Sequence, residues 1–157
     1  MEQTIYTVHN GAFCTEQASK RFNRALYGKY YEGEGSRIRI LSGELPEFLL
    51  LHKKDRGRLF FRVQEGTGTK LLSQAASIKM SYYQGRTIQT IQDEALGDGT
   101  LLVETVPDLN LHGAIIKVKW TGKNPLPLYA ITGCASMRES PRGLDPGYYN
   151  QDAEGIC

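Results

Sequence analysis

Short alternating segments, each closed by a turn signal, fill most of this chain and constrain its fold more than any other feature. In SRIRIL, residues 36–41, Ile38 and Ile40 fall on one side and two arginines on the other, which is the two-residue period of a half-buried strand. About eight such segments follow one another up to Met137, separated by turns rich in glycine and proline. This spacing is typical of a sandwich or barrel. We therefore predict an all-β fold, a two-sheet antiparallel β-sandwich.

Individual segments carry more specific expectations. EFLLLH (47–52) and RLFFRV (58–63) are joined by a short charged loop and predict a β-hairpin. KLLSQAA (70–76) predicts either a strand or one helical turn. TLLVETVPDL predicts a strand up to Pro107, because proline cannot donate to a ladder.

The two ends of the chain lack the alternation, so we divide the 157 residues into three parts. Residues 1–35 predict an irregular N-terminal arm, in which EQASKRFNRALY (16–27) is either a short helix or irregular chain. Residues 36–137 predict the β-sandwich core. Residues 138–157 are rich in glycine and proline, and we predict a loop-like tail that is the truncated start of a further element.

Charge and hydropathy exclude two classes of partner. The net charge is +2, from 19 basic and 17 acidic residues, which is too balanced to predict binding to nucleic acid. The longest apolar run, Phe48 to Leu51, is far shorter than a membrane span, so no membrane partner is predicted. The first residues lack the basic and apolar regions of a signal peptide, and the localisation stays undetermined.

Neither a metal site nor a cofactor site is predicted from the spacing of ligating residues. The histidines, none spaced for metal binding, are His9, His52 and His112. The cysteines also lack zinc or redox spacing and are interpreted as free, with one disulfide left open: Cys14, Cys134 and Cys157. No catalytic residue is predicted.

Acidic pairs are interpreted as solvated turn charges. A glycosidase needs two carboxylates that face each other across a cleft, and proximity in sequence does not provide this. The pairs are Glu44 with Glu47, Glu32 with Glu34, and Asp93 with Glu94.

Aromatic side chains are the candidate ligand-binding groups, because they can stack on sugar rings. The carbohydrate-binding candidates are Tyr83, Trp120, Tyr148 and Tyr149. Trp120 shares its strand face with Ile116 and Val118, which favours a core position for it. The two tyrosines of the tail are expected to be exposed.

Two motifs carry a family resemblance: RFNRALYG at Arg21–Gly28 and SGELPEFLL at Ser42–Leu50, followed by the strand pattern of residues 74–120. Together they resemble the N-terminal β-sandwich domain of a family of large bacterial proteins of uncharacterised activity, common in Gram-negative gut bacteria. Those proteins resemble the six-hairpin glycosidases, in which an N-terminal sandwich packs on an α/α barrel. The resemblance covers roughly residues 20–137. Read locally, the second motif is a turn in which Pro46 stops a ladder and Phe48 enters the core.

The resemblance implies a non-catalytic accessory domain of a carbohydrate-processing, glycoside hydrolase-like protein. Its catalytic carboxylates would lie in the barrel, which this chain lacks, and the barrel would be the partner. Full-length relatives would be exported to the periplasm or cell surface, with any leader missing from this chain. One alternative is an autonomous carbohydrate-binding module that holds a glycan through exposed tyrosine and tryptophan. A small enzyme with a site in a sandwich cleft is a third hypothesis.

Overall fold

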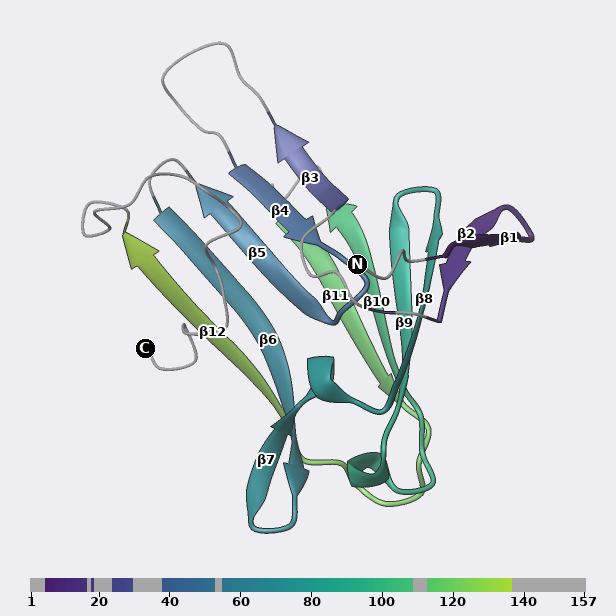
Figure 1. The fold of residues 1–157 in the computed structure, drawn as a ribbon. Coiled ribbons are helices and arrows are strands. Elements are labelled where there is room, and N and C mark those ends of the chain that lie inside the picture. The colour runs from purple at the N-terminus through teal and green to yellow at the C-terminus, as the bar shows by residue number, and fades with distance from the viewer. Residues whose placement is uncertain are drawn as a thin grey trace.

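The computed structural model describes residues 5–16, 18, 24–29, 38–52, 55–108 and 113–136. These residues form two antiparallel sheets that face each other (Figure 1), so the predicted all-β sandwich is confirmed. Two short 3-10 turns, η1 (Leu72–Gln74) and η2 (Glu94–Leu96), are the helical elements of the described part of the chain.

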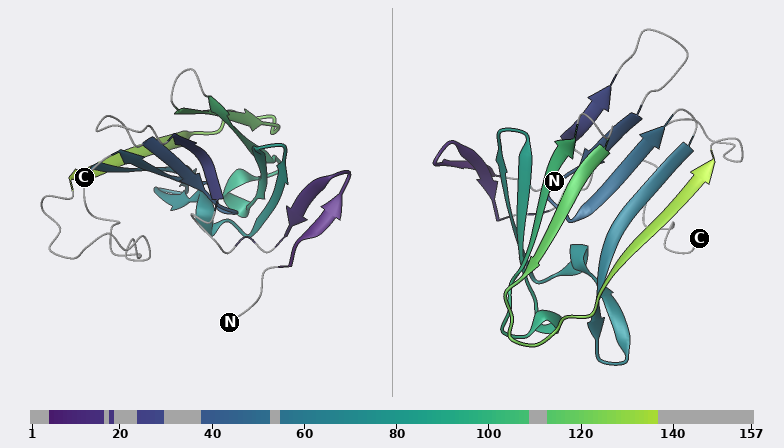
Figure 2. Two further views of the ribbon diagram at one scale, coloured as in Figure 1. Left: turned by 90° about the horizontal axis from the view of Figure 1, so that it is seen from above. Right: turned by 180° about the vertical axis from the view of Figure 1, so that it is seen from behind.

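Sheet A has the strand order β1-β2-β8-β9-β10-β11. Its strands are β1 (Thr7–His9), β2 (Ala12–Thr15), β8 (Ser77–Tyr83), β9 (Arg86–Gln92), β10 (Leu101–Asp108) and β11 (Gly113–Trp120). Consecutive hairpins build β8 to β11, and the β1–β2 hairpin is added beside β8. Figure 2 shows this hairpin projecting beyond the body of the sandwich.

Sheet B has the order β12-β6-β5-β4-β3, with β7 paired to β6. Its strands are β3 (Arg24–Lys29), β4 (Ile38–Ser42), β5 (Glu47–His52), β6 (Asp55–Glu65), β7 (Gly68–Leu71) and β12 (Leu128–Ser136). The predicted hairpin of residues 47–63 is confirmed as β5 and β6. Both readings of residues 70–76 hold in part, because β7 ends at Leu71 and η1 follows directly.

The core lies between the inner faces of the two sheets, which are the faces turned toward each other. Directly paired residues project from the same side of a sheet, so the row Ile78–Ile91–Leu101–Trp120 marks the inner face of sheet A. Phe48 and Phe61 mark that of sheet B, and their rings meet edge to face with centroids 6.4 Å apart. Phe48, two residues after Pro46, therefore enters the core, as predicted.

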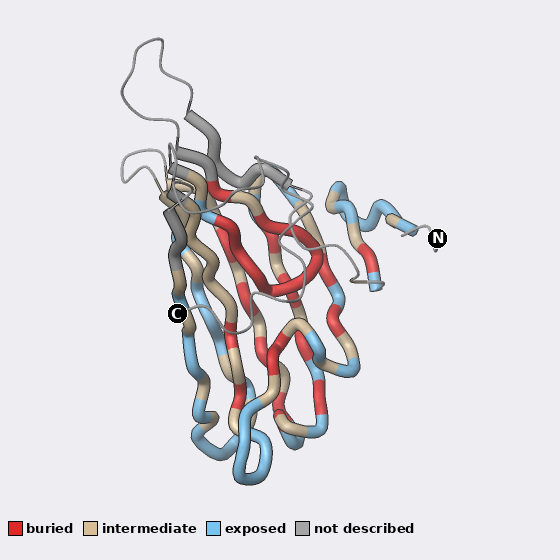
Figure 3. Tube along the Cα trace, turned by 60° about the vertical axis from the view of Figure 1, so that its left-hand side comes forward, coloured by how far each residue is buried: buried red, intermediate tan, exposed pale blue. Residues whose placement is uncertain are grey.

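At the closed end of the sandwich, η1 and the loop 121–127 connect the two sheets, and η2 contacts β6. Leu72 and Leu96, from the two 3-10 turns, belong to the same buried cluster as Ile91 and Leu101. Figure 3 shows buried residues gathered in the strands that face each other, whereas the projecting β1–β2 hairpin is exposed along most of its length. The apolar residues of the alternating strands are therefore fully buried only where the two sheets face each other.

β10 continues one residue beyond Pro107, where the sequence predicted its end. Pro107 pairs with Ala114 of β11, whereas the pairing of β10 with β9 ends at Thr105 and Thr87. Proline is tolerated at this position because β10 has a ladder partner on one side only.

The segment predicted as an irregular arm contains three strands. β1 and β2 pair with each other and with β8, and β3 pairs with β4 across a bulge between Ala25 and Tyr27. β3 includes the last four residues of the segment predicted as a short helix or irregular chain (24–27), because pairing along β4 outweighs its weak local pattern. The tail 138–157 lies outside the described residues.

Candidate functional site

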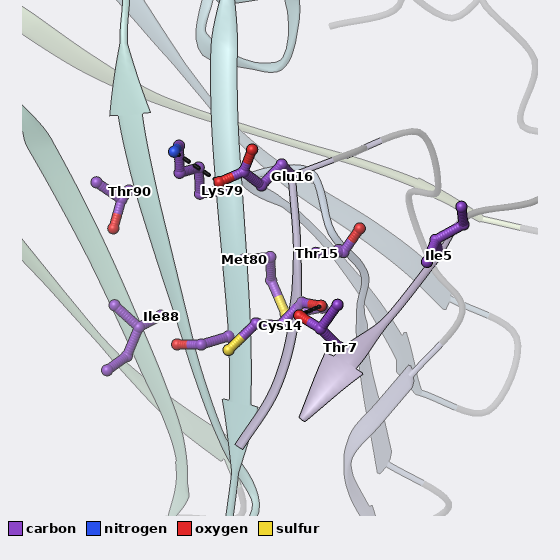
Figure 4. Close-up of a pocket in the computed structure, with 10 residues that line it drawn as sticks. Ile5, Thr7, Cys14, Thr15, Glu16, Lys79, Met80, Ile88 and Thr90 are labelled. Carbon is purple, nitrogen blue, oxygen red and sulfur yellow. Dashed lines mark hydrogen bonds and ion pairs between the residues drawn. The ribbon is translucent and has the colours of Figure 1, made fainter. Parts of the chain in front are cut away.

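A pocket of about 570 Å³ lies where the β1–β2 hairpin meets β8 and β9 (Figure 4). It opens on the outer face of sheet A, the face turned away from sheet B. Cys14 pairs with Ser81, which in turn pairs with Ile88, so these three residues form one row on this face. Lys79 and Thr90 form the adjacent row. The volume falls within the range of small-molecule sites.

One ion pair supplies the charge at this pocket. Nζ of Lys79 donates to Oε1 of Glu16 at 2.7 Å, which ties the end of β2 to β8. Both side chains are exposed, so the pair adds little to the free energy of unfolding. Deeper in the pocket, Cys14 holds a free thiol whose Sγ lies 3.8 Å from the carbonyl oxygen of Ala12.

The described lining residues of the pocket offer hydrogen-bonding groups. Hydroxyl groups of Thr7, Ser81 and Thr90 line it, and no histidine lies among its described lining residues. A nucleophilic cysteine needs an adjacent base, and the carboxylate nearest in sequence, Glu16, is bound to Lys79. The prediction that Cys14 is free is confirmed. The Cys134 side chain and Cys157 lie outside the described residues.

The structure does not bring together Tyr83 and Trp120, the two predicted aromatic residues that it describes. Tyr83 ends β8 at the hairpin with Arg86 and is partly exposed beside Gly11. Trp120 on β11 shares a cross-strand row with Ile78 on β8, which is three strands away in the sheet. Ile78 in turn precedes Tyr83 by five positions along β8. At about 3.3 Å per residue and 4.8 Å per strand, the two rings are on the order of 20 Å apart and form no common platform. Tyr148 and Tyr149 lie outside the described residues.

Trp120 is held by the closed end of the sandwich. It packs against the core cluster, and its Nε1 donates to the carbonyl oxygen of Asn124 at 2.7 Å. The ring lies directly against Gly99 and Gly122, since a Cβ at either glycine would fall 2.0 Å from a ring atom. Its indole donor is therefore already engaged within the chain.

Glu44 and Glu47 are not solvated turn charges, and that prediction is wrong. The exposed fractions of these residues are 0% and 1%. Oε2 of Glu47 accepts from Nη2 of Arg58 at 2.8 Å, and the guanidinium of Arg58 also lies over the ring of Phe60. Glu44 accepts from the hydroxyl of Tyr6. Burial is possible because each carboxylate meets a donor: Tyr6 is 38 positions from Glu44, and Arg58 lies on β6, the strand that pairs with the strand of Glu47.

A buried amide fixes the turn that carries these carboxylates. Nε2 of Gln89, on the inner face of β9, donates to the carbonyl oxygens of Gly43, Glu44 and Leu45 at 3.2, 3.3 and 2.8 Å. The whole segment from Ser42 to Leu49 is buried. The turn is therefore an internal support between the sheets. Local sequence patterns do not reveal this contact, because Gln89 lies more than forty residues away.

Asp93 is also structural rather than solvated, although its neighbour Glu94 is exposed. Its carboxylate binds Nζ of Lys70 at 2.9 Å and accepts from the backbone N–H groups of Ala76 and Ala95. Burial raises the pKa of Asp93, but these three hydrogen bonds outweigh it and the net pKa lies below the ordinary value. The same contact with Asp93 raises the pKa of Lys70.

Sequence reasoning did not identify the apolar side chains that are exposed on the inner faces of the sheets. The row Val8–Phe13–Tyr82–Thr87 belongs to the inner face of sheet A, and Thr87 is fully buried. Along this row toward the hairpin the exposed fraction rises to 51% at Phe13 and 68% at Val8. We call Val8 and Phe13 the hairpin face. The described strands of sheet B do not cover it.

The remaining chemistry of the described residues is limited. No group of three or more histidine, cysteine or acidic side chains that could hold a metal ion occurs among them. His9 is exposed, whereas the His52 side chain and His112 lie outside the described residues. Within the same part of the chain, no helix is long and apolar enough to cross a membrane.

Comparison with known proteins gives one match. Residues 55–148, more than half of the chain, match the family described as a domain of unknown function (DUF4450). No curated protein and no solved structure matches the chain.

Proposed function

The chain belongs to the DUF4450 family, and we propose that it acts as a non-catalytic accessory β-sandwich domain of a carbohydrate-processing protein. The observation that carries this proposal is the exposed hairpin face. An accessory sandwich needs an apolar surface on which its catalytic neighbour packs, and Val8 and Phe13 extend an inner sheet face past the edge of their own sandwich. The α/α barrel implied by the sequence resemblance is the proposed neighbour.

The polar groups of the domain support a structural role. The buried carboxylates Glu44 and Glu47 contact Tyr6 and Arg58, and Asp93 caps η2 while binding Lys70. Each of these carboxylates is committed to holding one segment of the chain on another. Such contacts suit a rigid platform rather than a reaction centre.

The test is binding of the full chain to a separately expressed α/α-barrel domain from a longer protein that carries a DUF4450 domain. Isothermal titration calorimetry should show binding that a Val8→Ser, Phe13→Ser double variant weakens by at least about thirtyfold, because apolar anchors dominate interfaces. Tyr129→Ser is the matched control, since Tyr129 is equally exposed but lies on the outer face of β12. Absence of binding, or equal binding by both variants, would overturn the proposal.

A glycan array on the same proteins separates the rival function. The partly exposed Tyr83 is the one described candidate that offers its ring to a sugar. Glycan binding that survives in the double variant and disappears in Tyr83→Ala would make the chain an autonomous carbohydrate-binding module instead.

A further inference from the structure

A second uncovered region lies on the opposite side of the sandwich, between β11 and the inner face of sheet B. A cleft of about 480 Å³ is bounded there by Leu50, Leu59 and Phe48 of sheet B and by Ala114 and Ile116 of β11. Leu50 shares its row with the buried Ile40, so it projects from the inner face. It is nevertheless 46% exposed, because sheet A ends at β11 and does not reach across β5.

β11 is a long free edge beside this cleft. It spans eight residues and, within the described part of the chain, pairs only with β10. Natural edge strands are usually short, bulged or covered, because their unpaired N–H and C=O groups accept a further strand. In the described part of the chain β11 is neither short nor bulged and has no strand on its other side, and Ile115 and Val118 are both exposed along it. The exposed Lys117 and Lys119 are charges of the kind that oppose pairing with an unmatched strand, so they select a strand that carries acidic residues. One more strand beside β11 would continue sheet A over Leu50.

The side chains of β11 define the chemistry of such a strand. Its inner face carries Ala114 and Ile116, whose row partners Pro107 and Thr105 lie on β10. Its outer face carries Lys117 and Lys119, both exposed. A strand paired with β11 would place one set of alternate residues in the apolar cleft and the other set opposite the two lysines. Apolar residues alternating with acidic ones satisfy both faces.

The lysines also argue against a second copy of this chain as the occupant. If two β11 strands paired antiparallel with matching faces, Lys117 and Lys119 would lie opposite the same lysines or Ile115 of the other copy. Like charges placed directly across a ladder are destabilising. Every register that places lysine opposite lysine is therefore disfavoured for a second copy, and a strand of different sequence that carries acidic residues avoids this repulsion.

We propose that β11 and the adjacent cleft form a strand-addition site for an extended segment of a partner protein in which apolar and acidic residues alternate. Main-chain hydrogen bonds to β11 would supply affinity, and the cleft and the lysines would supply register and specificity. The site is separate from the hairpin face, which lies at the other edge of sheet A.

The experiment uses the full chain and a fluorescein-labelled peptide of sequence Glu-Leu-Glu-Val-Glu-Leu-Glu-Val. We expect saturable binding by fluorescence anisotropy at low ionic strength, and at least about tenfold weaker binding when the glutamates are replaced by lysines. A peptide with proline at its two central positions should not bind, because proline interrupts the ladder. Hydrogen exchange should show protection gained over Gly113–Trp120.

Variants of the chain locate the site. Lys117→Glu combined with Lys119→Glu should reverse the preference, so that the lysine peptide binds about tenfold more tightly than the glutamate peptide. Ala114→Phe should fill the cleft and weaken binding of the glutamate peptide by about tenfold or more. If that variant does not fold, Leu50→Gln changes the floor of the cleft at a half-exposed position.

Three results would overturn the inference: no anisotropy change with the glutamate peptide, equal binding of both peptides, or protection on β12 instead of β11. The Val8→Ser, Phe13→Ser variant should bind the peptide as wild type does. Peptide binding without barrel binding would refute the proposed function alone, and barrel binding without peptide binding would refute this inference alone.

Discussion

The closed end of the sandwich and its uncovered sides are built from the same kind of strand, yet they differ sharply in burial. At the closed end Leu101 is 1% exposed within the core cluster, whereas Leu50, also on an inner face, is half exposed. The difference lies in what each leucine faces. Leu101 packs with residues of both sheets and of the two 3-10 turns, whereas Leu50 borders an unfilled cleft. Alternation therefore identifies which face of a strand is apolar, and the extent of the facing sheet decides whether that face is buried.

Leucine truncation at the two places gives the largest expected contrast. Leu101→Ala should lower the free energy of unfolding by roughly 2–5 kcal/mol, because it leaves a cavity in a packed cluster. Leu50→Ala should cost less than about 1 kcal/mol, because its side chain already contacts water. Urea denaturation measures both. Equal losses would show that the cleft is filled in solution and would remove the distinction.

A glycine substitution probes the packing of the closed end. Gly122→Ala would place a Cβ 2.0 Å from the Trp120 ring, so the ring must move and the unfolding free energy should fall by about 1–3 kcal/mol. Gly68→Ala is the control, because its nearest neighbour is a backbone oxygen at 3.9 Å and its backbone is unstrained. Tryptophan fluorescence should shift in the first variant only. An unshifted spectrum and unchanged stability would mean that the closed end is loosely packed.

Removing the side-chain amide of Gln89 tests the contact between β9 and the turn at residues 43–45. Gln89→Leu removes the shared side-chain donor of the carbonyl oxygens of Gly43 and Glu44, whereas the carbonyl oxygen of Leu45 keeps the backbone N–H of Glu47. We expect the free energy of unfolding, measured by thermal unfolding, to fall by about 1–3 kcal/mol. Gln92→Leu, at an exposed position of the same strand, should stay within about 0.5 kcal/mol of wild type.

Asp93 gives the smallest effect, and it depends on pH. Because its folded pKa lies below the ordinary value of 3.8, its contribution to stability is present above that pH and is lost as the pH falls through the folded pKa. Asp93→Asn should cost about 1 kcal/mol at neutral pH and flatten the loss of stability in acid. Parallel acid-unfolding curves for the two proteins would contradict this assignment.

The sequence predicted the fold class because strand period and turn residues are local properties. Nearly every strand from β4 to β12 lies where alternation placed it, and the faces of Ile116, Val118 and Trp120 were assigned correctly. β3 was not predicted because its pattern of alternating apolar residues is weak. Its structure depends on pairing with β4.

The candidate sites could be predicted from the sequence less well than the fold class. The burial of Glu44 depends on Tyr6, thirty-eight positions away, and alternation carries no information about such contacts. The separation of Tyr83 from Trp120 depends on register across four strands. The uncovered faces follow from how far each sheet extends, which no single segment specifies.

The pairing of β12 with β6 has a consequence for the order of folding. β8 to β11 are joined by short local hairpins, whereas Leu128 must find Val63 across more than sixty intervening residues. Loop closure over that distance is slow compared with hairpin formation, so we expect the four-stranded meander to form early and β12 to join late. During synthesis, β6 would remain an open edge until residues 128–136 had left the ribosome, and that interval is when the nascent domain is most exposed to mispairing.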